Sequence, residues 1–263
     1  MNDLPPVSCM CLTYGRPQLL EEAIQSFLLQ NYSGPKELVV LNDFDKQTLE
    51  FVHPEVVVIN VPRRFHSLGE KRNACAALCS HDILFVWDDD DIFLPHRLTY
   101  SVRMFEPTKG YFKSSKGFVL NNGALSGPNM NIYHSASCFS RILFNEAHGY
   151  RHMGSGQDLD LELAFESMIG KDKNYKDASL DEIYYLYRWA GTGSYHLSGF
   201  GKDNPSGETG NKKVERYVQQ QVNRQVLSVG NVKLEPHWSV DYVSLVLQYI
   251  STGTLKDERT ENE

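Results

Sequence analysis

Short apolar runs, each of strand length, recur through the first part of the chain. They lie at Val7–Thr13, Glu37–Leu41, Val56–Val61 and Ile83–Trp87. A continuous apolar run of this length is typical of a strand that is buried on both faces of a parallel sheet. The segments Pro17–Gln30 and Leu68–Leu78 lie between these runs and are predicted helices, the first with its apolar residues along one side. This order of elements predicts an α/β fold, with a mostly parallel sheet flanked by helices.

The pattern changes after a further helix, which we expect to begin near Leu94-Pro95. Gly117–Asn121 and Met130–His134 are predicted to pair as strands around the turn residues Ser126–Asn129. The other predicted elements are a short helix at Phe139–Phe144, a strand at Ile183–Trp189, a helix at Lys212–Val226 and a final apolar element at Val240–Tyr249. No internal repeat is visible, so we expect one large domain.

A helix that ends near Met168 is predicted to follow Gly154–Gly156. Its apolar positions, spaced for one buried face, are Leu159, Leu163, Ala164 and Ile169. Asp158 lies at its start, where free backbone N–H groups and the helix dipole favour a carboxylate. Asp158 is therefore either a simple N-cap or a functional carboxylate. Gly191–Gly210 is a long glycine-rich loop that contains His196, and such loops are typical of mobile lids or binding loops.

Four consecutive aspartates, Asp88–Asp91, follow the apolar run Ile83–Trp87. Adjacent carboxylates at the end of a buried strand repel one another unless a cation lies among them. A divalent metal is the obvious cation, because such metals are often held by few carboxylates together with substrate phosphates. The alternative is a solvated acidic turn that caps the next helix.

Three polar groups fall at the carboxyl ends of the predicted strands, namely Tyr14, Asp43 and Asp88–Asp91. The carboxyl ends of parallel strands meet at one edge of a sheet, and ligands of α/β proteins bind beyond that edge. We therefore expect these three groups to lie around one ligand site.

Composition adds few constraints. The net charge of −7 and the lack of a long basic run do not indicate binding to nucleic acid or to an anionic membrane. We find no signal peptide and no transmembrane segment, and we expect a cytoplasmic protein. Cys9 and Cys11 share a strand face and Cys75 and Cys79 share a helix face, so a zinc site is conceivable, although buried structural thiols are favoured.

Six motifs in order make the chain resemble the GT-A fold, family 2 nucleotide-sugar glycosyltransferases over roughly its first 200 positions. The motifs are VSCMCLTYGRP, ELVVLND, LGEKRNACAAL, WDDDDIFLPHRL, GQDLDLELA and YRWAGTGSYHLS. Two positions depart from the family pattern: Gly15 stands where an asparagine is usual, and Gln157 replaces the glutamate of the family's E-D pair.

The resemblance implies a role for each of eleven residues. The donor nucleotide-sugar is expected to contact Leu12, Thr13, Tyr14, Arg16, Asp43, Arg72, Asp88 and Asp89. Leu12, Thr13 and Tyr14 would surround the base, and Asp43 would accept a hydrogen bond from a ring nitrogen of uracil. Asp90 and His196 are the expected metal ligands, with the register inside the four aspartates open by one residue. Asp158 is the expected general base.

The resemblance further implies a Mn²⁺- or Mg²⁺-dependent inverting glycosyltransferase, with a UDP-sugar as the favoured donor. Single displacement is expected because no second motif offers a carboxylate nucleophile. The acceptor is left open between a glycan, a lipid-linked sugar and a hydroxylated DNA base, as in a phage enzyme. A nucleotidyltransferase and a degenerate nucleotide-sugar-binding protein remain alternatives. Residues 1–105 are the expected nucleotide-sugar half, 106–250 the acceptor and catalytic-base half of the same domain, and 251–263 a flexible tail.

Overall fold

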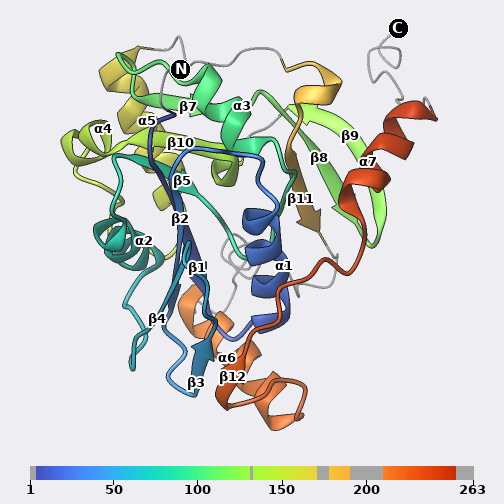
Figure 1. The fold of residues 1–263 in the computed structure, drawn as a ribbon. Helices are drawn as coiled ribbons and strands as arrows, with labels where there is room; N and C mark the ends of the chain where they lie inside the picture. The colour runs from blue at the N-terminus through green and yellow to red at the C-terminus, as the bar shows by residue number, and fades with distance from the viewer. Residues whose placement is uncertain (1–3, 131–132, 171–177, 190–209, 253–263) are drawn as a thin grey trace, which may run out of the picture.

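The computed structural model of the chain describes residues 4–130, 133–170, 178–189 and 210–252 (Figure 1). Its centre is a six-stranded sheet in the order β4-β2-β1-β5-β10-β7. The strands are β4 (Val56–Asn60), β2 (Lys36–Asn42), β1 (Val7–Thr13), β5 (Ile83–Val86), β10 (Ser137–Ser140) and β7 (Tyr111–Lys113). The first four pair in parallel, and β10 is antiparallel to both of its neighbours. The prediction of an α/β fold with a mostly parallel sheet is confirmed.

Helices cover both faces of this sheet because its central strands are apolar on both sides. Helix α1 (Pro17–Leu28) packs on one face and α2 (Leu68–Leu78) on the other (Figure 1). The α1 side contains Cys9 and Cys11, whereas Cys75 and Cys79 lie on the α2 side. The sheet therefore separates the two cysteine pairs, which excludes a zinc site built from all four. All five cysteines are free and buried.

A second sheet, in the order β6-β11-β8-β9, packs beside the first on the α1 side. Its strands are β6 (Ile92–Phe93), β11 (Tyr185–Trp189), β8 (Lys116–Asn121) and β9 (Ala124–Met130). The remaining elements are β3 (Gln47–Glu50), α3 (Arg97–Met104), the 3-10 turns at His134–Ala136 and Leu180–Glu182, α4 (Arg141–Glu146), α5 (Gln157–Ile169), α6 (Gly210–Asn223), β12 (Gly230–Lys233) and α7 (Tyr242–Ser251).

The last described part of the chain returns to the first part. Strand β12 pairs in parallel with β3, and α6 packs over the ends of β1 and β2 (Figure 1). The contact of α6 is a small apolar cluster of Phe44, Val218 and Leu227. Residues near both ends of the sequence therefore border the same end of the central sheet.

The predicted turn at Ser126–Asn129 is wrong, because these residues lie within β9. The hairpin turns instead at Asn122 and Gly123, whose φ angles are 49° and 80°. A two-residue hairpin turn of this kind requires positive φ at both positions, which Asn-Gly adopts at little cost. Of the predicted strand Met130–His134, Met130 ends β9, and residues 131–132 lie outside the described ranges.

Three predicted helices need correction. Helix α3 begins at Arg97 rather than near Leu94, because Ile92 and Phe93 first pair with β11. Phe139 belongs to β10, and α4 begins only at Arg141. Helix α5 has the predicted position, but Leu159 and Leu163 are exposed, and it buries Leu161 and Phe165 instead. Both pairs have the spacing of one helix face, and the packing of Phe165 on Tyr111 and Phe139 decides between them.

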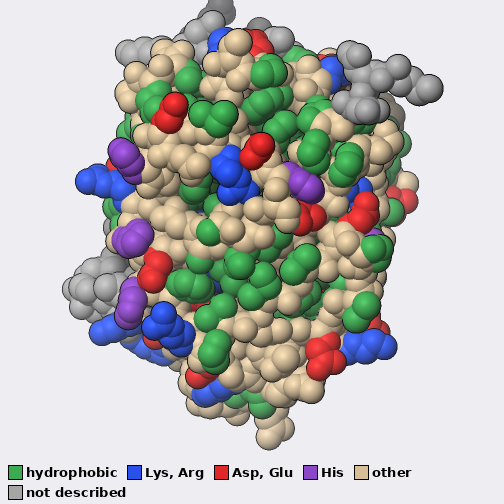
Figure 2. Space-filling model, turned by 60° about the vertical axis from the view of Figure 1, so that its left-hand side comes forward, with side chains coloured by type: hydrophobic (Ala, Val, Ile, Leu, Met, Phe, Trp, Pro, Cys, Tyr) green, Lys and Arg blue, Asp and Glu red, His purple; other side chains and the backbone are tan. Residues whose placement is uncertain are grey.

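Charged side chains of both signs are mixed with apolar ones on the face shown in Figure 2, where the described residues form no continuous basic surface. Within the described ranges, no helix has the length and apolar character that crossing a bilayer requires.

Gly69, near the start of α2, is closed in by the loop that precedes α5. Its N–H donates to Met153 O at 3.2 Å, and an added Cβ would lie 1.8 Å from Arg151 O. We predict that Gly69→Ala lowers the free energy of unfolding by about 1–3 kcal/mol, because the loop must move to admit the methyl group. Urea unfolding measures this change.

Gly154→Ala is the matched control, because nothing lies within 4 Å of the Cβ that it would add. We expect its unfolding free energy to stay within about 0.5 kcal/mol of wild type. Equal stability of the Gly69→Ala and Gly154→Ala variants would show that the contact between loop and helix is loose.

Candidate nucleotide-sugar site

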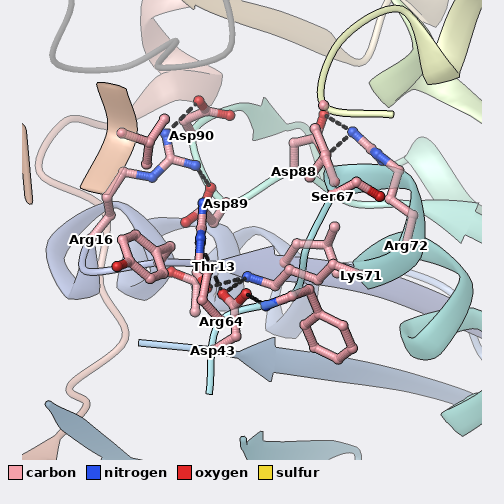
Figure 3. Close-up of a pocket in the computed structure, with 16 residues that line it drawn as sticks. Thr13, Arg16, Asp43, Arg64, Ser67, Lys71, Arg72, Asp88, Asp89 and Asp90 are labelled. Atoms are coloured by element: carbon pink, nitrogen blue, oxygen red, sulfur yellow. Dashed lines mark hydrogen bonds and ion pairs between the residues drawn. The ribbon is translucent and has the colours of Figure 1, made fainter. Parts of the chain in front are cut away.

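A cavity lies at the carboxyl ends of β1, β2 and β5, beside the start of α2 (Figure 3). Nine of the eleven predicted site residues line it: Leu12, Thr13, Tyr14, Arg16, Asp43, Arg72, Asp88, Asp89 and Asp90. As predicted, these residues come together because the carboxyl ends of parallel strands meet at one edge of the sheet. Asp158 does not line the cavity, and His196 lies outside the described residues.

Asp43, at the end of β2, is buried and accepts hydrogen bonds from three donors. Lys71 Nζ donates to its Oδ1 at 2.5 Å, Arg64 donates to the same oxygen at 3.1 Å, and the Phe65 N–H donates to Oδ2 at 3.0 Å. Lys71 Nζ also donates to Thr13 O at 2.6 Å, which ties α2 to the end of β1. Burial lowers the pKa of Lys71, although Asp43 acts to raise it.

Arg64 also contacts Tyr14. Its guanidinium carbon lies 3.6 Å from the centre of the Tyr14 ring, and its Nε lies 3.7 Å from Glu215 Oε1 on α6. Sequence reasoning missed both Arg64 and Lys71 as partners of Asp43. A signal was present, because Arg63-Arg64 follows the strand β4 at the same edge of the sheet, and Lys71 directly precedes the predicted donor-site residue Arg72.

Two of the aspartates share one arginine. Arg16, between β1 and α1, pairs with Asp89 and donates to Asp90 Oδ2 at 2.8 Å (Figure 3). Asp89 is fully buried, and burial raises its pKa to about 6 against the lowering effect of Arg16. The turn after β1 therefore supplies the positive charge that the acidic segment requires.

Asp88 points the other way, toward α2 (Figure 3). Arg72 donates to Asp88 Oδ1 at 3.0 Å, and Ser135 Oγ donates to Oδ2 at 2.6 Å. The fully buried Arg97 connects β5 to the Ser135 segment, because it donates to Val86 O at 2.5 Å and to Ser135 O at 2.7 Å. The end of β5 and the Ser135 segment are thereby fixed relative to each other.

Asp91 does not face the cavity but accepts a hydrogen bond from Tyr185 OH at 2.8 Å. Behind the segment, Arg188 Nε donates to Asp90 O at 2.6 Å, and the same guanidinium pairs with Glu22 on α1. Glu22 also accepts from Ser239 and Tyr242 near the C-terminal end of the described chain. The acidic segment is therefore no solvated turn, since each of its four side chains is bound by a donor from another element.

A sequence profile described as Glycosyl transferase family 2 matches residues 8–135. This segment runs from β1 to β9 and contains all nine predicted site residues that line the cavity. Residues 8–135 belong to glycosyl transferase family 2. The predicted family is confirmed for this segment. A search of curated protein sequences gave no significant match.

Solved structures that are similar to this chain show its fold. S. aureus TarS 1–349 has a TM-score of 0.53 at 13% identity, covering 70% of this chain and 60% of its own. TarS 1–349 in complex with UDP-GlcNAc has a TM-score of 0.52 at 14% identity, and the match covers 85% of this chain and 67% of that one. The mannosyltransferase PcManGT from Pyrobaculum calidifontis, in complex with GDP-Man and Mn²⁺, has a TM-score of 0.52 at 14% identity. The match covers 98% of this chain and 83% of that one. The chain thus spans 60% of the length of the first TarS structure, and the predicted GT-A fold is confirmed.

The carboxylates of the cavity suit a hard divalent cation in part. Asp88 and Asp90 border the cavity with the oxygen ligands that Mg²⁺ and Mn²⁺ prefer. In the described part of the chain, no three His, Cys, Asp or Glu side chains are grouped so that they could hold a metal ion. The donor set therefore fits a cation that takes further ligands from water and a diphosphate, as Mg²⁺ commonly does.

Asp158 lies in the first turn of α5 but is not its N-cap, which is Gly156 with φ 78°. Its Oδ1 accepts only a local hydrogen bond from the Leu159 N–H at 2.9 Å among those resolved here. Its charge acts to raise the pKa of both Arg72 and Tyr150. Gln157 is buried against α2 and has a packing role.

A buried polar cluster supports this side of the site from α5. Glu162 accepts from Lys113 Nζ at 2.9 Å and lies 2.9 Å from His134 Nδ1, and His134 Nε2 lies 2.8 Å from Tyr150 OH. Burial alone raises the pKa of Glu162, but the hydrogen bonds and charges of His134 and Lys113 outweigh it and lower the pKa to about 2. The folded state therefore strongly favours the ionised carboxylate.

This shift predicts a loss of stability in acid. The folded-state pKa lies below the ordinary value of 4.5, so the stabilisation is complete above pH 4.5 and disappears as the pH falls toward about 2. The gap corresponds to about 3 kcal/mol. Urea unfolding from pH 2.5 to 7 should show a difference between wild type and Glu162→Gln that is largest above pH 4.5 and shrinks in acid.

Asp160→Asn is the control on the same helix, because the Arg151 partner of Asp160 is exposed. We expect that variant to differ from wild type by less than about 1 kcal/mol at every pH. A Glu162→Gln deficit that stays constant down to pH 2.5 would contradict the assignment of the low pKa to Glu162.

Proposed function

We propose that the chain is a metal-dependent inverting glycosyltransferase that moves a sugar from a nucleotide-sugar, with UDP-sugars favoured, to an acceptor hydroxyl. The observation that carries this proposal is one cavity, within the family 2 segment, whose lining joins Tyr14 and Asp43 to Asp88–Asp90. The first pair suits a base, and the acidic segment with its arginines suits a diphosphate.

Hydrogen-bond chemistry at Asp43 supports the choice of base. A buried carboxylate accepts a hydrogen bond from a ring N–H, which uracil, thymine and guanine offer and cytosine lacks. The Tyr14 ring supplies a stacking surface beside it. Similar folds have been solved with UDP-GlcNAc and with GDP-Man, so the pyrimidine preference rests on the pocket of this chain and needs a direct test.

Asp90, with Asp88 nearby and His196 from the glycine-rich loop, is the proposed metal site. A bound Mn²⁺ or Mg²⁺ would neutralise the negative charge of the leaving diphosphate. Arg16 and Arg72 lie at the same end of the cavity and add positive charge there. These residues orient the donor so that its sugar projects toward the Asp158 side.

Asp158 is the proposed general base, which takes the proton of the acceptor hydroxyl while that oxygen attacks the anomeric carbon. Its carboxylate does not cap α5, and its charge acts on Arg72, which lines the cavity. A double displacement needs a second carboxylate as nucleophile. Asp160 pairs with Arg151 and Glu162 is buried with Lys113, which leaves Asp158 as the proposed base and supports single displacement with inversion.

The acceptor is a hydroxyl of a glycan, a lipid-linked sugar or a hydroxylated DNA base. Product mass after incubation with each class, and with a UDP-sugar and Mn²⁺, would separate these possibilities.

The first test is nucleotide binding by calorimetry with UDP, TDP, GDP and CDP. UDP should bind in Mn²⁺ at least about tenfold more tightly than in chelator, and Asp90→Ala should remove that difference because it removes a carboxylate ligand. Leu159→Ala, an exposed change on α5, is the control. Equal UDP binding in chelator would exclude the metal, and preferential binding of GDP would exclude the uridine assignment.

The second test concerns the base. Asp158→Asn keeps the shape of the side chain but cannot accept a proton, so we expect kcat to fall by about 10²-fold or more with UDP binding nearly unchanged. Asp160→Asn, two residues along the same helix, should retain activity. Near wild-type turnover by Asp158→Asn, or an α-linked product from an α-linked donor, would contradict this mechanism.

A further inference from the structure

Arg64 makes both of the contacts that the proposed function assigns to a nucleotide base. Its guanidinium lies flat enough on Tyr14 to place its carbon 3.6 Å from the ring centre. One of its N–H groups donates to Asp43 Oδ1 at 3.1 Å. A guanidinium is planar and delocalised, so it stacks on an aromatic ring and donates in its own plane as a base does.

Asp43 has little capacity left for a base while these contacts last. It is only 1% exposed and already accepts from Lys71, Arg64 and the Phe65 N–H. The Phe65 donor is backbone, and the buried Lys71 is held by Thr13 O as well. Arg64, whose side chain is 22% exposed, is the one of these three donors that can leave without unfolding its surroundings.

Space for the displaced Arg64 guanidinium lies beside α6. A second, open hollow adjoins the cavity past Tyr14 and Arg64, between Phe44–Lys46 and α6. Its lining includes the carboxylates of Asp45 and Glu215 together with three cations, and Glu215 already lies 3.7 Å from Arg64 Nε. The cations are Lys46, Lys212 and Arg216. A short rotation of the Arg64 side chain toward α6 therefore exchanges one anionic partner for another.

We infer that Arg64 is a specificity-determining residue that occupies the base subsite and must be displaced by the incoming base. This inference rests on the proposed nucleotide-sugar donor. A ligand with a flat ring and an N–H donor replaces both contacts that Arg64 gives up, whereas an anion without a base replaces neither. Displacing Arg64 therefore costs binding free energy only for ligands that carry a base, and a base with a ring N–H offsets this cost better than cytosine, which lacks that donor.

The test compares UDP with inorganic pyrophosphate, which has the diphosphate charge but no base. Calorimetry in Mn²⁺ should show that Arg64→Ala lowers the Kd for UDP by about tenfold, the scale of one desolvated cation–π contact. The Kd for pyrophosphate should change by less than about twofold. Arg63→Ala is the matched control, since Arg63 is an exposed arginine one residue away and its loss removes the same charge.

Arg64→Met gives a second variant that keeps an unbranched side chain over Tyr14 without its charge or donors, and thermal unfolding confirms that each variant is folded. Unchanged or weaker UDP binding by both Arg64 variants would overturn the inference and leave the proposed function standing. The same holds if UDP and pyrophosphate change in parallel. Failure of UDP to bind wild type and both variants would overturn the proposed function itself.

Discussion

Negative charge buried at the end of β5 is the constraint on which the site depends. Four consecutive carboxylates cannot be packed there unless donors from other elements reach them, because burying an unpaired charge costs several kcal/mol. The donors come from the turn after β1, the start of α2, the segment before β10, and β11: Arg16, Arg72, Ser135 and Tyr185. Neutralising the acidic segment therefore fixes the positions of elements that are far apart in the sequence.

The same ion pairs form two charged groups in the lining of the cavity. Asp43 lies with Arg64 and Lys71 at one end of the cavity (Figure 3). Arg16 and Arg72 pair with the aspartates at the other end. Each cation lies within a few ångströms of an anion, so the cavity has alternating charge rather than one sign. Such a lining distinguishes a ligand with a precise order of polar groups from one that is merely anionic.

Sequence reasoning located the site because strand ends in a parallel sheet meet at one edge, and Tyr14, Asp43 and Asp88 all follow strands. The sequence places Arg64 at the same edge of the sheet, but its contact with Asp43 was missed because it joins residues 21 positions apart and depends on one side-chain rotamer. Sequence reasoning also predicted the wrong buried face of α5, because Leu159 and Leu163 have the same spacing as Leu161 and Phe165. The general base and the second metal ligand were inferred from resemblance alone, and their roles are still predictions.

The bonds of Glu22 have a consequence for the order in which the chain folds. Glu22 joins Arg188, whose Nε holds the Asp90 carbonyl, to Ser239 and Tyr242. A ribosome delivers these partners more than 160 and 210 residues after Glu22 itself. During synthesis the early strands can form while Glu22 is unpaired, but the backbone of the acidic segment acquires its final support only after the C-terminal residues have left the exit tunnel.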